Sequence, residues 1–313
     1  MAAHDVVLYY LLNASSALYL SAAHNALYFL LGWHTVVLHF WHYCLTFCFL
    51  LLCSVIGMQR WSKPLPISPF ILPITTQIII VLLLNRIHSQ IRSGSLYLLR
   101  VFDFLTTITV AKFSKWLLRS ERNPPISLLV PIAFGGSLSW MELSLIEYET
   151  YSLIFAPVLA ILQGFQVLQI QKCYQTLNAN QPETFILYFT GFTTIGLSIP
   201  AFYSWINSTI SADASWESID YLLIGMSLMF MPNYKYSEMW LQLNLTAYDF
   251  MVLEQAKFWA ASIGQWLVQN MAHATIFAFT GKIIMLGALM RYFIEIKRLQ
   301  KAEYNDLSQT LFN

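Results

Sequence analysis

Charged residues are scarce in this chain, since Asp, Glu, Lys and Arg together make up 11% of its 313 residues, against about 25% in soluble domains. Hydrophobic residues make up 57%. A water-soluble surface cannot be built from this composition, because too few charged side chains are present to face solvent. At roughly 20 apolar residues for each bilayer crossing, the chain is long enough for about ten crossings. We therefore expect an integral membrane protein without a large aqueous domain.

A basic excess and paired cysteines are also lacking. The formal net charge of +1 argues against a nucleic-acid partner, which normally requires a basic patch. None of the four cysteines belongs to a C-x-x-C pair, and three of them, Cys44, Cys48 and Cys53, lie in one apolar run. Thiols in such a run usually behave as small hydrophobic side chains. We expect no disulfide framework, no metal site and no cofactor.

Apolar runs separated by Pro, Gly and charge clusters predict ten membrane-spanning helices. The runs lie near residues 6–31, 35–57, 68–84, 95–118, 126–146, 151–171, 184–206, 219–233, 248–269 and 272–296. The runs at 68–84 and 219–233 are short, and short segments at matching positions of two halves are typical of internally repeated transporters. We expect an all-α integral membrane fold of two inverted five-helix repeats. Residues 1–175 form the first repeat, and residues 176–313 form the second together with a short cytosolic C-terminal tail.

The positions of the basic residues predict the orientation of these spans. With both termini in the cytosol, eleven Lys and Arg residues flank the spans on the cytosolic side, Lys235 among them, and only Arg86 and Arg92 fall on the other side. The segments near 147–149 and 213–220 carry acidic residues and no Lys or Arg. This bias satisfies the positive-inside rule. It favours ten spans with cytosolic termini over nine or eleven.

Four charged residues fall inside the apolar runs at 95–118 and 248–269. Arg100 precedes Asp103 by three residues, and Glu254 precedes Lys257 by three. This spacing places each pair on one helical face. A bare cation in hydrocarbon costs at least about 2.5 to 3.5 kcal/mol, so each cation needs a partner. Two interpretations stay open: the carboxylates only neutralise the cations, or the cations line a central cavity from both repeats and bind the phosphates of an anionic substrate.

The stretch GSLYLLRVFDFLTTITVAKFSKWLLRSERNPPISLLVPIAFGGSLSWME resembles the fourth and fifth helices of the nucleotide-sugar and triose-phosphate translocators of the drug/metabolite transporter superfamily. The stretch NLTAYDFMVLEQAKFWAASIGQW resembles the ninth helix of that family. The resemblance implies that Lys257 is the substrate lysine. Asn25 stands where many members have Asn-Lys in the first helix, and Phe258 stands where phosphate translocators usually have Arg.

Helical spacing from the two cations makes Tyr97, Phe104 and Tyr248 candidates for contact with the substrate. The predicted substrate-binding residues are therefore Arg100, Lys257, Asp103, Glu254, Asn25, Tyr97 and Tyr248. The resemblance implies a secondary transporter that exchanges a nucleotide sugar for a nucleoside monophosphate by alternating access, in a Golgi or endoplasmic reticulum membrane. Its partners would be this anionic substrate and the lipid bilayer, and a homodimer is left open.

Three alternatives stay open beside this function. The protein could carry another organic or sugar-phosphate anion, or it could be a transport-inactive membrane scaffold. The least favoured alternative is a membrane enzyme that uses the cluster His34, His39 and His42. Di-iron desaturases and hydroxylases need about eight histidines in several boxes, and elongases need H-x-x-H-H; this chain has seven histidines and neither pattern. We therefore expect that the protein is not an enzyme.

We predict that residues 207–218 face the lumen. The sequence Asn207-Ser208-Thr209 is a glycosylation sequon on that side, although it lies close to the membrane. A Ser215→Cys variant, made in a cysteine-free background, should react with a membrane-impermeant thiol reagent in sealed vesicles only when the lumenal face is accessible. Labelling from the cytosolic face would contradict the proposed orientation.

Overall fold

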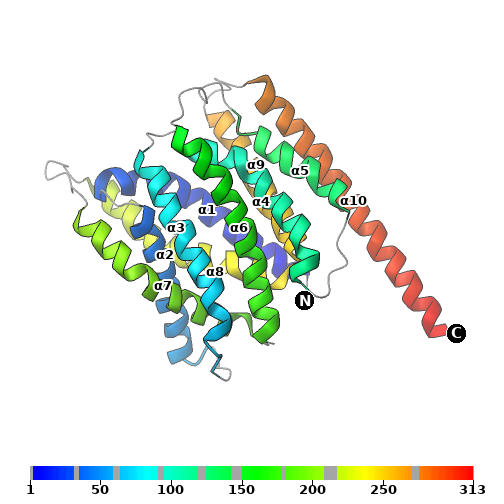
Figure 1. The fold of residues 1–313 in the computed structure, drawn as a ribbon, viewed down its shortest axis with the longest axis horizontal. Coiled ribbons are helices and arrows are strands. Elements are labelled where there is room, and N and C mark those ends of the chain that lie inside the picture. The colour runs from blue at the N-terminus through cyan, green and yellow to red at the C-terminus, as the bar shows by residue number, and fades with distance from the viewer. Residues whose placement is uncertain are drawn as a thin grey trace. The chain divides into compact units, whose positions relative to one another are not determined.

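The computed structural model of the protein describes residues 3–31, 35–58, 64–90, 95–118, 125–141, 150–177, 181–207, 217–268 and 275–312. Over these residues the chain is helical, with no strand (Figure 1). The α-helices are α1 (Ala3–Leu31), α2 (Thr35–Val55), α3 (Ile71–Gln90), α4 (Ser95–Leu117), α5 (Ile126–Leu138), α6 (Thr150–Leu177), α7 (Pro182–Ile206), α8 (Ser218–Asn244), α9 (Ala247–Val268) and α10 (Ile276–Phe312). A short 3₁₀ helix, η1 (Ser68–Phe70), precedes α3. The predicted all-α class is confirmed for the described part of the chain.

Five segments among the described residues are long and apolar enough to cross a membrane, judged by length and composition. They are Thr35–Val55, Ser68–Ile87, Leu153–Leu177, Pro182–Ile206 and Ile276–Arg298. Helix α5 is apolar but has only 13 residues, and α4, α8 and α9 carry charged residues that lower their hydropathy. These apolar helices fit a multi-pass membrane protein.

Helix α8 differs from its predicted counterpart. It continues eleven residues beyond the predicted end at residue 233, because Pro232 lies inside the helix and does not end it. Proline is tolerated within membrane helices when neighbouring groups satisfy the freed backbone carbonyl. Lys235 therefore lies within a helix and not after one, and its assignment to the cytosolic side stays a prediction. Helix α10 likewise continues to Phe312, so residues after 296 extend the helix.

Helix contacts divide the chain into two compact units. Unit 1 comprises Met1–Ser95 and Phe165–Ala247, and unit 2 comprises Leu96–Gly164 and Tyr248–Asn313. Helix α6 contributes its first part to unit 2 and its second part to unit 1. Each unit thus takes segments from before and after residue 175, so the units are a different division of the chain from the two predicted repeats.

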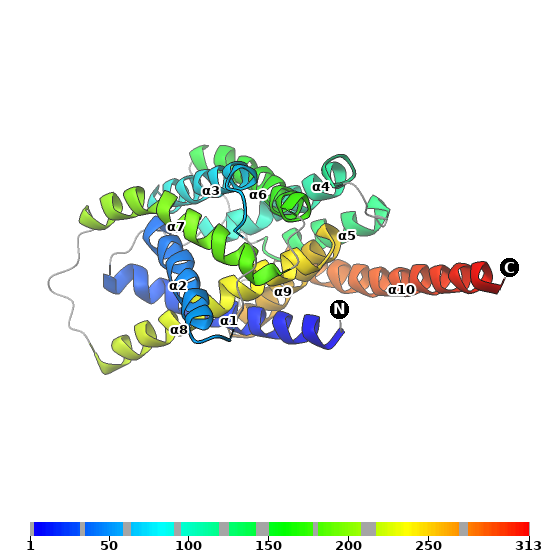
Figure 2. The same cartoon turned by 90° about the horizontal axis from the view of Figure 1, so that it is seen from below.

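Unit 1 is built around α2 and α8. Helix α1 packs along α8, and α2 packs against α3, α7 and α8 (Figure 2). Polar side chains join the helices: Asn13 Nδ2 of α1 donates to Ser237 Oγ of α8 at 3.2 Å. Gln171 Nε2 of α6 donates to the carbonyl of Gln242 at 2.8 Å, near the end of α8. Such bonds satisfy polar groups that would otherwise be buried without partners.

Unit 2 depends on a close approach of α5 to α10, which lie side by side in Figure 1. A methyl group added to Gly281 would lie 2.5 Å from the backbone nitrogen of Ser139, and one added to Gly135 would lie 2.8 Å from that of Met285. Small residues at helix interfaces permit this approach. Glycine at these two positions therefore sets the distance between α5 and α10.

The core of unit 2 draws side chains from α4, α5, α9 and α10. Its buried residues are Ala111, Leu128, Leu129, Ile132, Tyr248, Val252, Met285, Ala288, Leu289 and Tyr292. Thr106 Oγ1 of α4 donates to the carbonyl of Ala160 at 2.9 Å, which attaches the first part of α6. These contacts hold α4 and α9, which carry the predicted cations, in one body.

We predict that Gly281→Ala destabilises the protein by about 1 to 3 kcal/mol, because the added methyl group overpacks the interface of α5 and α10. The control is Gly287→Ala on the same helix, where an added methyl group meets no described atom within 4 Å. That variant should be neutral or more stable, by up to about 1 kcal/mol, because alanine favours a helix. Thermal unfolding of the detergent-solubilised protein measures both. Equal effects at the two positions would refute the close approach.

Candidate functional site

The first charged pair of the candidate site lies on α4. Arg100 Nη1 donates to Asp103 Oδ2 at 2.9 Å. The Asp103 side chain is 13% exposed and that of Arg100 is 31% exposed. The i,i+3 pairing expected from the sequence is therefore present, and it neutralises the guanidinium within its own helix.

The second pair lies on α9 and is more deeply buried. Lys257 Nζ donates to Glu254 Oε1 at 2.6 Å. The Lys257 side chain is 4% exposed, and that of Glu254 is 15% exposed. An ammonium that is buried to this extent requires a carboxylate close by, because desolvation of an unpaired charge is costly.

The ring of Phe258 brings the two pairs together. The guanidinium carbon of Arg100 lies 3.4 Å from the ring centroid, and Lys257 Nζ lies 5.0 Å from it. Both distances are within the range of a cation–π interaction. Lys257 also acts electrostatically on the Asp103 carboxylate of the other helix. We call Arg100, Asp103, Glu254, Lys257 and Phe258 the charge cluster.

Gln255 fixes the position of α9 against α4. Its Nε2 donates to Thr107 Oγ1 at 3.2 Å and to the carbonyl of Asp103 at 3.5 Å. On the side of α5, Gly136 leaves room for the Gln255 side chain, which a β-carbon at that position would meet. Sequence reasoning missed Gln255. The only available signal was its place between Glu254 and Lys257.

Helix α10 forms hydrogen bonds with both α5 and α9. Lys282 Nζ donates to the carbonyl of Ser139 at 3.1 Å, just after the last residue of α5. Trp259 Nε1 of α9 donates to the carbonyl of Lys282 at 3.2 Å. A cation at a helix C-terminus is favourable because the carbonyl groups there lack partners within the helix.

The remaining predicted site residues lie outside the charge cluster or outside the described side chains. Tyr248 is fully buried in the core of unit 2, and its hydroxyl donates to the carbonyl of Ala111 at 2.9 Å. It lies nine residues before Lys257, about 13 Å along the helix axis, so the structure does not bring it to the cluster. Asn25 and Tyr97 lie on α1 and α4, and their side chains are outside the described residues.

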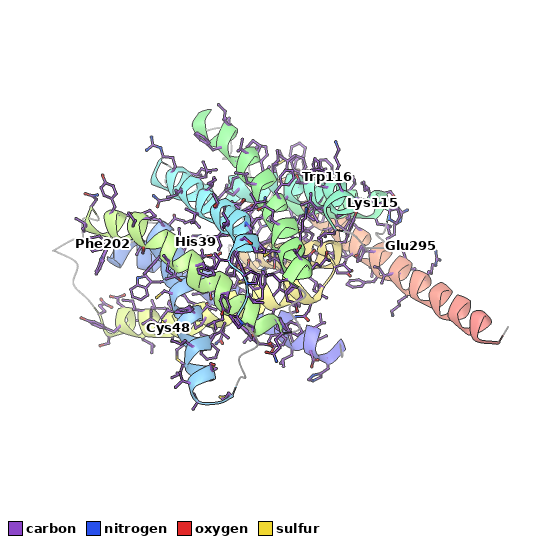
Figure 3. The ribbon with its side chains drawn as sticks, turned by 60° about the horizontal axis from the view of Figure 1, so that its bottom comes forward. His39, Cys48, Lys115, Trp116, Phe202 and Glu295 are labelled. Atoms are coloured by element: carbon purple, nitrogen blue, oxygen red, sulfur yellow. The ribbon has the colours of Figure 1, made fainter. Side chains whose placement is uncertain are left out.

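The histidine cluster is described in part. The rings of His39 and His42 on α2 have centroids 5.9 Å apart, and Figure 3 labels His39. His34 lies outside the described residues. Over the part of the chain that the structure describes, no group of three or more His, Cys, Asp or Glu side chains could hold a metal ion.

A third pair, partly buried, lies on α8 in unit 1, and sequence reasoning missed it. Lys235 Nζ donates to Glu238 Oε2 at 2.6 Å, and it lies 4.8 Å from the ring centroid of Tyr43 on α2. The signal was the same i,i+3 spacing that identified the other two pairs. It was overlooked because the predicted helix ended before Lys235.

No protein-family model matches this chain, and no curated protein matches it. A solved structure described only as "Crystal structure of protein" is similar in fold, with a TM-score of 0.67 and 11% sequence identity. The match covers 95% of this chain and 99% of that chain. At this identity the similarity shows the fold alone.

We predict that Phe258→Leu destabilises the protein by about 0.5 to 2 kcal/mol, because leucine fills the space but offers Arg100 and Lys257 no aromatic face. Phe279→Leu on α10 is the matched control, because that side chain is 52% exposed. Thermal unfolding of the two variants in the same detergent tests the difference. A loss of stability no larger for Phe258→Leu than for the control would show that the ring is only filling space.

Proposed function

We propose that the protein is a secondary transporter that exchanges a nucleotide sugar for a nucleoside monophosphate across a Golgi or endoplasmic reticulum membrane. In this proposal the chain is two inverted five-helix repeats with cytosolic termini, and it works by alternating access. The observation that carries the proposal is the charge cluster, in which Arg100 and Lys257, from the fourth and ninth helices, both contact Phe258.

The chemistry of the cluster suits a phosphate group. A guanidinium can bind two phosphate oxygens at once, and an ammonium acts as a compact point charge. Asp103 and Glu254 accept hydrogen bonds from these two cations, so a phosphate group would replace or join the carboxylates as their partner. An intramembrane ionisable residue is by default a candidate for a substrate pathway, and here two such cations lie in one compact unit. The same chemistry would serve another organic or sugar-phosphate anion.

A transport-inactive scaffold is the second candidate function. It is favoured by the intrahelical pairing itself, since each cation already has a carboxylate within 2.9 Å. Under this alternative the pairs serve only to bury charge. The two candidates differ in what removal of a whole pair should do.

We predict that Arg100→Ala and Lys257→Ala each weaken the binding of the transported nucleotide sugar roughly tenfold or more, because each removes a charge-assisted contact of about 1.5 to 3 kcal/mol. Exchange in reconstituted vesicles, measured with a panel of nucleotide sugars and nucleoside monophosphates, gives the affinities. Arg298→Ala is the control, because Arg298 forms an i,i+3 pair with Glu295 but is 70% exposed.

Removal of complete pairs separates the two functions. Single neutralisations leave an unpaired carboxylate and should lower stability, whereas the double changes Arg100→Leu with Asp103→Leu, and Glu254→Leu with Lys257→Leu, should be tolerated. A transporter should then fold but fail to bind its substrate. A charge-free double variant that exchanges nucleotide sugar at the wild-type rate would refute the assignment of the phosphate site.

A further inference from the structure

The charge cluster is electrically neutral before any substrate binds. Its ion pairs join two cations, Arg100 and Lys257, to two carboxylates, Asp103 and Glu254. Both cations lie over the ring of Phe258, the residue after Lys257, and this ring adds no charge. A site built this way differs from one that holds an excess of positive charge ready for an anion.

Binding of a phosphate group would upset this balance. A phosphate that takes Arg100 and Lys257 as partners leaves the carboxylates of Asp103 and Glu254 without their cations. These side chains are 13% and 15% exposed, so little water is available to solvate them. Burial of uncompensated negative charge is strongly unfavourable, and a buried carboxylate in this position becomes protonated instead.

Among the described residues, the polar groups on the neighbouring helices already have partners of their own. From α9, Gln255 contributes a neutral amide that donates to Thr107 and to the Asp103 carbonyl. From α5, the Ser137 hydroxyl accepts a bond from the backbone nitrogen of Phe104. From α10, the ammonium of Lys282 donates to the carbonyl that follows α5.

We propose, resting on the proposed function, that an anion binds the charge cluster together with at least one proton. The anion replaces Asp103 Oδ2 as the partner of Arg100 and Glu254 Oε1 as the partner of Lys257. A proton from the aqueous phase then binds one of the carboxylate oxygens that the cations have released. Release of the anion re-forms the ion pairs and returns the proton to water. The protein is thus a proton-linked anion carrier, and substrate and proton cross the membrane in the same direction.

Calorimetric titration measures this proton directly. The purified full-length protein is titrated with UDP-glucose, GDP-mannose and UDP-N-acetylglucosamine in turn, each in buffers of different ionisation enthalpy, and the dependence of the heat on the buffer gives the protons bound per anion. Nucleoside diphosphate sugars are chosen because the charge of their diphosphate group does not change near neutral pH. Any proton that is counted therefore binds to the protein. We expect about one proton or more per anion, and an affinity that falls roughly tenfold for each unit of pH above neutrality.

Two variants assign the proton. Asp103→Asn with Glu254→Gln carries neutral side chains at both positions, so it should bind the anion without proton uptake and with little dependence on pH. Glu295→Gln removes a carboxylate of the same i,i+3 kind on α10 (labelled in Figure 3) whose side chain is 35% exposed, and it should keep the wild-type proton count.

The outcomes are distinct. The proton linkage is overturned if the wild type binds the anion without proton uptake, or if proton uptake is unchanged in the variant that lacks both carboxylates. Either result leaves the proposed transport function standing. Absence of binding by every nucleotide sugar, at acidic as well as neutral pH, overturns both the proton linkage and the proposed function.

Discussion

A charged side chain in an apolar helix needs a polar partner close by, because desolvation of an unpaired charge is costly. Three described ion pairs are at least partly buried, and each joins residues three apart on one helix: Arg100 with Asp103, Lys235 with Glu238, and Glu254 with Lys257. Such a pair needs no partner from another helix. The helices can therefore carry charge and still pack as apolar surfaces, and α4 and α9 bring two such pairs to one aromatic ring.

Close helix packing then decides how these pairs are positioned. Gly164 of α6 lies against Thr109 of α4, and Gly281 of α10 lies against the end of α5. Buried polar side chains add specific contacts to this packing, because the bond of Gln255 to Thr107 joins α9 to α4 at one point along each helix. The resulting core is held by shape and by a few hydrogen bonds. The positions of the charged side chains therefore depend on how α4 and α9 pack in that core.

Much of this arrangement could be predicted from sequence because it depends on local spacing. Apolar runs predicted the helices, and the i,i+3 rule predicted the pairs on α4 and α9. Contacts between helices could not be predicted in the same way. Phe258 was noted only for standing where a cation was expected, and its role became visible once Arg100 was placed on its ring. Tyr248 has a helical spacing that suited a substrate contact, but its hydroxyl donates a hydrogen bond to the carbonyl of Ala111 on α4. Sequence spacing does not reveal this partner.

The most direct test of this account is an experimental structure of the protein with a nucleotide sugar bound. The account predicts phosphate oxygens within about 3 Å of the Arg100 guanidinium and the Lys257 ammonium, with Asp103 and Glu254 no longer bonded to these cations. A bound phosphate elsewhere in the protein, with both ion pairs still intact, would contradict it.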